Sequence, residues 1–436
     1  MEWYYILLIV WALILVLFLS GMPVAFAFIT MNFIGIYIWM GGVAGFMTVV
    51  SSAFNMLNNY LLVPVPLFVL MGMILFHSGA GWLVIDALDQ WIGRIPGRLS
   101  VLAVAAGTAF AVVSGVPMGT TAMLGTVMVP EMRRRGYSKI MSLGPVMGGG
   151  CLSMLVPPSA MAVILGGLAG VSIGKLLIAM FVPGFLLSGL YMIYIIFQAI
   201  LHPDQAPKYM AERVSFRKKM ISLRYILPLA GVVFLVTGII FFGVATPTEA
   251  AATGSLASFI LVATYRKFSW SALNKSIMGS TQVTVMVMII IIGSVAFSQF
   301  LAYTGCTHAL ARYAGQLTLP PIFLIIAMQI VVFILGCFMD LISIAMITTP
   351  IFMPIINTLG IDPIWFLTMV MINLGAGLLT PPFGMVLFTM KGVAPKDVTM
   401  GDIIGSAIPY FIMNLIVIGL MLIFPSLVLW LPGLMK

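Results

Sequence analysis

Apolar stretches follow one another along almost the whole chain, and very few charged residues separate them. Of the 436 residues, 62% are hydrophobic and 7% are charged, whereas about a quarter of the residues in a soluble domain carry a charge. A water-soluble fold would lack the polar residues that its surface needs. The sequence therefore predicts an all-α polytopic protein of the lipid bilayer, with room for roughly ten to twelve spans of ~20 residues.

The N-terminal region and the cysteines narrow the class further. The first basic residue of the chain is Arg94, so we expect the first apolar stretch to be a retained helix and not a cleaved signal peptide. We expect no cofactor and no transition-metal site, because the cysteines lack the spacing of a zinc motif or a disulfide framework. The three cysteines are Cys151, Cys306 and Cys337.

Two segments, about 98–132 and 318–358, are too long for one membrane span and too interrupted for two. We interpret both as re-entrant helical hairpins, which enter and leave the bilayer on the same side. The other apolar spans are expected near residues 4–20, 23–42, 53–77, 140–170, 175–201, 224–243, 247–265, 276–302, 363–394 and 402–431.

With both hairpins counted as re-entrant, one face receives 17 Lys and Arg residues and the other receives 3. By the positive-inside rule the first face is cytoplasmic and both termini lie outside. The basic residues are thus interpreted as topology determinants, and a nucleic-acid partner is not expected. The cytoplasmic set is Arg94, Arg98, Arg133, Arg134, Arg135, Lys139, Lys208, Arg213, Arg217, Lys218, Lys219, Arg224, Arg266, Lys267, Lys275, Lys391 and Lys396, and the outer set is Lys175, Arg312 and Lys436.

The chain also aligns with itself at an offset of 224 residues. Residues 130–161 match 354–385 without a gap, with ten of 32 positions identical. Prolines and glycines fall in register, and the charge count gives the two copies opposite orientations. Inverted repeats with broken helices are typical of secondary transporters.

This repeat divides the chain into parts. We expect scaffold helices in 1–52, a first inverted repeat in 53–201, a polar cytoplasmic linker in 202–223, further scaffold helices in 224–275 and a second inverted repeat in 276–436.

Two Pro-Pro pairs, Pro157-Pro158 and Pro381-Pro382, interrupt apolar spans at equivalent positions of the repeat. Each proline frees the carbonyl four residues earlier, and such a carbonyl at membrane depth must be buried in protein or line a polar cavity. Paired breaks favour sites for a small cation over plain structural kinks. The candidate cation ligands at the breaks are Ser153, Met154, Pro157, Ser159, Gly377, Thr380 and Pro381.

The tips of the hairpins are the next candidates. Free N–H groups at helix N-termini favour anions, so a carboxylate could be held between two tips without a buried lysine; the alternative is that small residues there only permit close helix packing. Further candidates for the cation, which the resemblance given below implies is sodium, are Ser114, Gly115, Gly336 and Asp340. Substrate candidates are Ser114, Thr120, Thr121, Pro158, Met339 and Pro382.

Two acidic residues have both a functional and a structural interpretation. Asp340 lies deep in a predicted membrane element, where an acidic residue is costly; it either faces a cation or caps the helix that follows. Glu249 follows Thr246 and Pro247 with the spacing of a capping box, which favours a structural role. His77, His202 and His308 form no catalytic set.

At these motifs the chain resembles the large membrane subunit of tripartite ATP-independent periplasmic (TRAP) transporters. The resemblance extends over nearly the whole chain, and together its markers are specific. They are Gly21-Met22-Pro23-Val24-Ala25-Phe26-Ala27, Val156-Pro157-Pro158-Ser159, Thr246-Pro247-Thr248-Glu249-Ala250-Ala251-Ala252 and Thr380-Pro381-Pro382-Phe383-Gly384.

The resemblance implies sodium-driven uptake of a small organic acid, a carboxylate or a sulfonate, across the bacterial inner membrane. It also implies an elevator-type movement of a transport domain against a scaffold, a small four-helix membrane subunit on a separate polypeptide, and a periplasmic substrate-binding protein. One departure concerns the first tip, which is Ser114-Gly115-Val116-Pro117 here where the family usually has Ser-Gly-Ser-Ser, so a hydroxyl is lost and the substrate class is left open.

Other functions remain as alternatives. Within transport, the alternative is a stand-alone or proton-coupled anion carrier. An intramembrane enzyme would need a nucleophile–base pair or metal ligands at membrane depth, and the sequence offers neither. A purely structural scaffold would not need paired broken helices.

Overall fold

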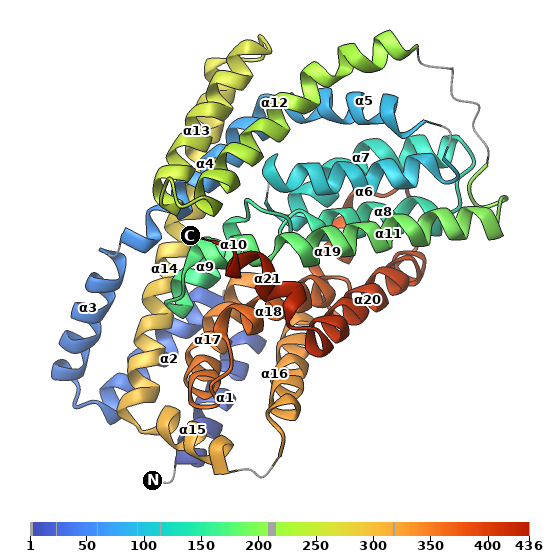
Figure 1. Cartoon of the computed structure of the whole chain (residues 1–436). Helices are drawn as coiled ribbons and strands as arrows, with labels where there is room; N and C mark the ends of the chain where they lie inside the picture. The colour runs from blue at the N-terminus through green and yellow to red at the C-terminus, as the bar shows by residue number, and fades with distance from the viewer. Residues whose placement is uncertain are drawn as a thin grey trace.

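The computed structural model describes residues 3–22, 24–58, 60–93, 95–113, 115–207, 215–316 and 319–435. These ranges form 21 α-helices and one short 3-10 helix, η1 (Tyr60–Leu62), with no strand (Figure 1). The helices of the first half are α1 (Trp3–Leu19), α2 (Val24–Trp39), α3 (Val43–Leu57), α4 (Pro64–His77), α5 (Ala80–Ile92), α6 (Arg98–Val113), α7 (Pro117–Arg134), α8 (Lys139–Leu152), α9 (Ala160–Ala169), α10 (Ile173–Ala179) and α11 (Phe181–Leu201).

The described residues of the second half also form helices. Its helices are α12 (Phe216–Phe241), α13 (Pro247–Thr264), α14 (Trp270–Tyr303), α15 (Cys306–Gln316), α16 (Pro321–Gly336), α17 (Leu341–Thr358), α18 (Pro363–Leu378), α19 (Met385–Val393), α20 (Met400–Ile423) and α21 (Ser426–Gly433).

Within the described ranges, only some helices are long and apolar enough to cross a membrane by themselves. There are five: α12, α14, α17, α20 and the run Ile173–Leu201, which joins α10 and α11. The remaining apolar helices are shorter, and α4 and α5 form a pair bent by 70°. Many of the spans expected from the sequence are therefore assembled from pieces.

The single span expected near 53–77 is wrong. Helix α3 already ends at Leu57, η1 follows, and α4 starts at Pro64, where a proline fits because the first helical residue needs no N–H partner. Two helices were also missed, α5 and α15. Both carry polar residues among the apolar ones, so they do not stand out as apolar stretches.

The repeat found in the sequence is present in the helices themselves. Adding 224 to the bounds of α7 gives those of α17. The residues that precede α8 and α18, Ser138 and Asp362, are equivalent, and each accepts a hydrogen bond from a backbone N–H of its helix. Gly136 and Gly360 are equivalent as well, with φ of 84° and 66°, a conformation that glycine adopts without strain.

Each helical hairpin packs on a broken helix of its own repeat. Helices α6 and α7 contact α8, and α16 contacts α18 (Figure 1). The backbones come close at glycines: a methyl group at Gly107 would lie 2.3 Å from the carbonyl oxygen of Gly149, and one at Gly377 would lie 2.7 Å from the Cα of Gly336. Small residues thus set the distance between hairpin and broken helix.

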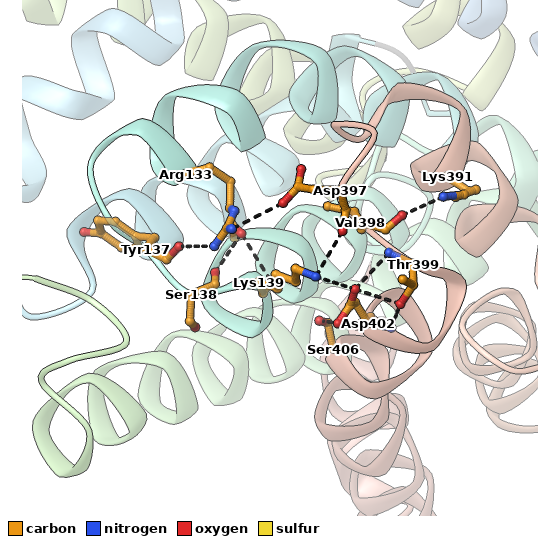
Figure 2. A network of polar contacts seen from close by, with 11 residues as sticks. Arg133, Tyr137, Ser138, Lys139, Lys391, Asp397, Val398, Thr399, Asp402 and Ser406 are labelled. Carbon is orange, nitrogen blue, oxygen red and sulfur yellow. Dashed lines mark hydrogen bonds and ion pairs between the residues drawn. The ribbon is translucent and has the colours of Figure 1, made fainter.

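A polar network joins the two repeats at one end of the molecule. Lys139 Nζ lies 2.7 Å from Asp402 Oδ2, and Arg133 Nη2 lies 3.5 Å from Asp397 Oδ2 (Figure 2). Asp402 also accepts a hydrogen bond from Thr399 N at the start of α20. The corner between α7 and α8 is therefore fixed to the corner between α19 and α20.

Other basic residues belong to the same end. Lys219 Nζ lies 5.9 Å from the centre of the Trp91 ring, and Ser138 N donates to Gln205 O at 2.8 Å. Arg98 Nη2 lies 2.8 Å from Asp89 Oδ2, so Arg98 and Lys219, two residues that the charge count assigned to one face, both contact the end of α5. Arg94, Lys208, Arg213 and Lys436 lie outside the described residues.

We predict that Gly107→Ala destabilises the protein by about 1–3 kcal/mol, because the added methyl overpacks the contact with α8. Thermal unfolding of the purified protein in detergent measures the loss. Gly231→Ala is the matched control, since nothing lies within 4 Å of that position and alanine favours the helix. Equal unfolding temperatures for wild type and Gly107→Ala would contradict the packing argument.

Candidate functional site

The first break separates α8 from α9 and is buried. Ser153 and Ser159 have no exposed surface. Ser159 Oγ donates to Met154 O at 2.6 Å and accepts from Ala162 N at 3.3 Å, so one side chain both serves a carbonyl that the prolines free and caps α9. The Pro157-Pro158 peptide bond is cis.

The second break, between α18 and α19, is stabilised differently. Thr380 N donates at 3.1 Å to Gly377 O, one of the carbonyls that the prolines free. Thr380 Oγ1 donates to Ala376 O at 2.9 Å, and Gly384 N donates to Thr380 O at 3.0 Å. Phe383 N donates to Cys337 O, which lies in the tip of the second hairpin, also at 3.0 Å. Pro381-Pro382 is likewise cis, and both prolines are exposed.

The first hairpin tip contacts the first broken helix. A methyl group at Gly115 would lie 3.9 Å from Ala160 N, and one at Gly150 would lie 1.9 Å from Thr121 Oγ1. Thr120 and Thr121 are fully buried. Among the described residues, Thr121 Oγ1 has no hydrogen-bond partner. Ser114 lies outside the described residues.

The second tip is organised around Asp340. Its Oδ2 accepts from Ile342 N and Ser343 N, both at 3.1 Å, and its Oδ1 accepts from Ser343 Oγ. Asp340 therefore caps α17, and the predicted capping role is confirmed. The capping carboxylate retains lone pairs, so a cation role remains compatible with this geometry. Met339, beside it, is buried.

The two halves of the site meet at α18. A methyl group at Gly375 would lie 3.3 Å from Met154 Cε and 3.8 Å from Leu155 Cδ1, so α18 packs against the first break. The structure thus groups the candidate residues around the two breaks. Gly115, Thr121, Ser153, Met154 and Ser159 lie together at the first break. Gly336, Asp340, Gly377 and Thr380 lie together at the second break.

Pro157 has a different environment from its repeat partner. It lines an apolar cavity of about 800 Å³ between α11 and α12, and no residue of the second break lines that cavity. Among the described residues, the only polar side chains in its wall are Thr108, Ser188 and Thr237, and the hydroxyls of the first two are 2.9 Å apart. This cavity does not suit an organic anion.

Two further sequence interpretations can be compared with the structure. Thr246 and Glu249 form the predicted capping box at the start of α13: Thr246 N donates to Glu249 Oε2 at 2.8 Å and Glu249 N donates to Thr246 Oγ1 at 3.3 Å. The structural role of Glu249 is confirmed. In the described part of the chain, no three His, Cys, Asp or Glu residues gather in a way that could hold a metal ion.

Buried amides near α18 were missed in the sequence. Asn373 Nδ2 donates to Gln329 O at 2.6 Å and to Gln329 Oε1 at 2.8 Å, and Asn414 Nδ2 donates to Tyr191 OH at 2.7 Å. These bonds join α16 to α18 and α11 to α20. The available signal was an amide in the middle of an apolar stretch, because a polar group buried there needs a partner.

Together the fold and this site define a helical membrane transporter. Comparison with known families supports that class: the model of the family described as "Tripartite ATP-independent periplasmic transporter, DctM component" matches residues 11–427. The chain belongs to this family and is the large permease subunit of such a transporter, not an enzyme.

Individual relatives agree with the family. The chain is 33% identical over 381 residues to the C4-dicarboxylate TRAP transporter large permease protein DctM of Pseudomonas aeruginosa, covering 87% of this chain and 88% of the relative. It is 28% identical to the ectoine TRAP transporter large permease protein TeaC of Halomonas elongata, covering 96% and 97%. The fold is similar to the crystal structure of the YdaH transporter of Alcanivorax borkumensis, with a TM-score of 0.62 at 16% identity and coverages of 88% and 89%.

We predict that Asp340→Ala destabilises the protein by about 1 kcal/mol through loss of the cap, whereas Asp340→Asn retains stability because asparagine is an equally good cap. Chemical or thermal unfolding in detergent measures both. Asp362→Ala is the matched control, since Asp362 caps α18 through two N–H bonds in the same way. A stable Asp340→Ala beside a destabilised Asp362→Ala would contradict the capping role.

Proposed function

We propose that this chain mediates sodium-coupled uptake of a small organic acid anion, a carboxylate or a sulfonate, across the bacterial inner membrane. The observation that carries the proposal is the pair of helix breaks, each packed against the tip of a hairpin in its own repeat. Paired breaks of this kind are the usual place for substrate and coupling ions in secondary transporters. The names of the relatives support organic solutes as cargo.

For sodium, we propose a site at each break. The ligands would be backbone carbonyls of residues 153–154 and 377–378 with the hydroxyls of Ser159 and Thr380, and Asp340 would add charge at the second site. Hard oxygen ligands suit a cation of this kind. Both hydroxyls keep acceptor capacity while donating to Met154 O and Ala376 O.

For movement and orientation, we propose that α6–α7 and α16–α17 are re-entrant hairpins of inverted repeats. They would move with the broken helices α8–α9 and α18–α19 as the transport body of an elevator against the scaffold. The basic end of the molecule would be cytoplasmic, and both termini periplasmic.

For partners, the family supports a small four-helix membrane subunit and a periplasmic substrate-binding protein. The outer face would carry little basic charge, so docking of the binding protein would depend on shape and on the small subunit. The competing function, a stand-alone or proton-coupled anion carrier, predicts full activity without these partners.

The test is uptake of labelled carboxylates and sulfonates into proteoliposomes that contain this chain and the small subunit, with the binding protein added outside. We predict uptake that requires an inward sodium gradient and that falls to background when either partner is omitted. Uptake without partners, or uptake driven by a proton gradient in the absence of sodium, would favour the competing function.

In the same assay, Ser159→Ala, Thr380→Ala and Asp340→Asn are each predicted to raise the sodium concentration for half-maximal uptake about tenfold, for a lost ligand worth ~1.4 kcal/mol. Ser269→Ala and Asp362→Asn are the controls, because they alter helix caps away from the breaks. Unchanged sodium dependence in all three test variants would make the breaks structural kinks.

A further inference from the structure

The apolar cavity lined by Pro157 extends along much of α12. Every third or fourth residue of that helix from Ile226 to Phe241 belongs to its wall, which corresponds to ~22 Å of helix. The facing wall comes mainly from α6 and α11. Helix α12 packs chiefly on α13 and α5, so the cavity separates it from α6 and α11.

The three hydroxyls in the wall of this cavity already have partners within the protein. Thr108 Oγ1 donates to Val104 O at 2.9 Å, and Thr237 Oγ1 donates to Val233 O at 2.6 Å. Ser188 Oγ, at 2.9 Å from Thr108 Oγ1, can donate to that oxygen. Water occupies a cavity where polar groups need partners. The occupant of this cavity is therefore apolar.

The cavity opens at the surface of helices that are able to span the membrane. Phe185 on α11 and Phe234 on α12 belong to its wall and are 53% and 71% exposed, and both helices lie in candidate membrane spans. A helix of another subunit, 10–12 Å across, would fill about 1,700 Å³ over ~22 Å. The cavity holds about 800 Å³. A thinner apolar chain fits it, and the bilayer supplies acyl chains.

A lysine and a tryptophan lie beyond the Ile226 end of the cavity. Lys219 precedes Ile226 by two helical turns and so lies on the same face of α12. Its Nζ is 5.9 Å from the centre of the Trp91 ring, and Trp91 Nε1 donates to Ser222 Oγ at 3.1 Å. Tryptophan is typical of the boundary between hydrocarbon and water. This end of the cavity therefore suits a lipid head group.

The charge at this end favours an anionic head group. Arg217, Lys218 and Lys219 follow one another at the start of α12. Within the described part of the chain, none of the three forms an ion pair with a carboxylate. Clusters of basic residues beside membrane helices attract anionic lipids.

We propose that an anionic phospholipid fills this cavity. One acyl chain lies along α12 between Ile226 and Phe241, and the phosphate is held at Lys219. The same chain contacts Pro157 at the first break. The site goes beyond the proposed transport function, since it requires neither the coupling ion nor an organic acid.

The test measures lipid binding to the purified, delipidated full-length chain in detergent. Dipalmitoyl phosphatidylglycerol, which is anionic, and dipalmitoyl phosphatidylcholine, which has no net charge, are titrated separately, and native mass spectrometry reports the bound lipid. We expect half occupancy by phosphatidylglycerol at a concentration about fivefold lower than by phosphatidylcholine. Equal binding of the two lipids, or binding of neither, would overturn the proposal.

The position of the acyl chain is tested by filling the cavity. Gly189 is in its wall, and a methyl group there would have no atom within 4 Å. Gly189→Phe should therefore raise the half-saturating concentration of phosphatidylglycerol about tenfold, equivalent to ~1.4 kcal/mol. Ala109→Phe, from the facing helix α6, is a second filling variant in case the first does not fold. Gly231→Phe is the matched control, since that position is equally open but outside the wall. Unchanged binding in a folded filling variant would overturn the cavity as the site.

The position of the head group is tested by removing charge. Lys219→Gln should weaken binding of phosphatidylglycerol about fivefold and leave that of phosphatidylcholine unchanged. Lys275→Gln is the control, because Lys275 is an exposed basic residue on α14 outside the wall of the cavity. An equal effect of the two substitutions would overturn the placement of the phosphate at Lys219.

The competing occupant of the cavity is a helix of the small subunit. The titration is therefore repeated with the small subunit bound. We expect phosphatidylglycerol to remain bound and to remain sensitive to Gly189→Phe. Loss of the lipid when the small subunit binds would assign the cavity to that subunit and overturn the proposal.

Discussion

The structure depends on one constraint: backbone groups that leave the helical pattern at membrane depth must find partners inside the protein. The prolines and the helix ends of this chain create many such groups. Ser159 Oγ donates to the carbonyl of Met154, and Ser294 Oγ donates to that of Met346. The Asp340 carboxylate accepts from two N–H groups of α17. Each partner is a short polar side chain placed close to the break. At the two breaks, where we propose sodium sites, a bound cation would complete the set of partners.

Close packing at glycines holds each hairpin against its broken helix. Gly107 against Gly149 and Gly336 against Gly377 bring each hairpin onto its broken helix at backbone contact. At that distance a hairpin cannot shift relative to its broken helix without a clash. This supports treating each hairpin and its broken helix as one stiff unit. The salt bridge between Lys139 and Asp402 connects the two units at the basic end.

Much of this arrangement was predictable because it follows from local chemistry. Prolines and glycines in register gave the repeat, and Thr246 with Glu249 gave the start of α13. The division near Leu57 was missed although Asn58, Asn59 and Pro64 lie there, residue types that mark helix ends and helix starts. The pairing of Asn373 with Gln329 depends on tertiary contact between α16 and α18, which no pattern within either helix encodes. The choice between capping and ion binding at Asp340 likewise needed the positions of Ile342 and Ser343.

The central claim is that equivalent hairpins of the two repeats open to opposite sides of the membrane. Arg134 and Thr358 are equivalent residues at the ends of α7 and α17, and both are exposed. Cysteines introduced there, in Arg134→Cys and Thr358→Cys, can be probed in intact cells with an impermeant thiol reagent, since the native cysteines are buried. The account predicts labelling of Thr358→Cys from outside and of Arg134→Cys only after the membrane is opened. Labelling of both from the same side would contradict the inverted repeat.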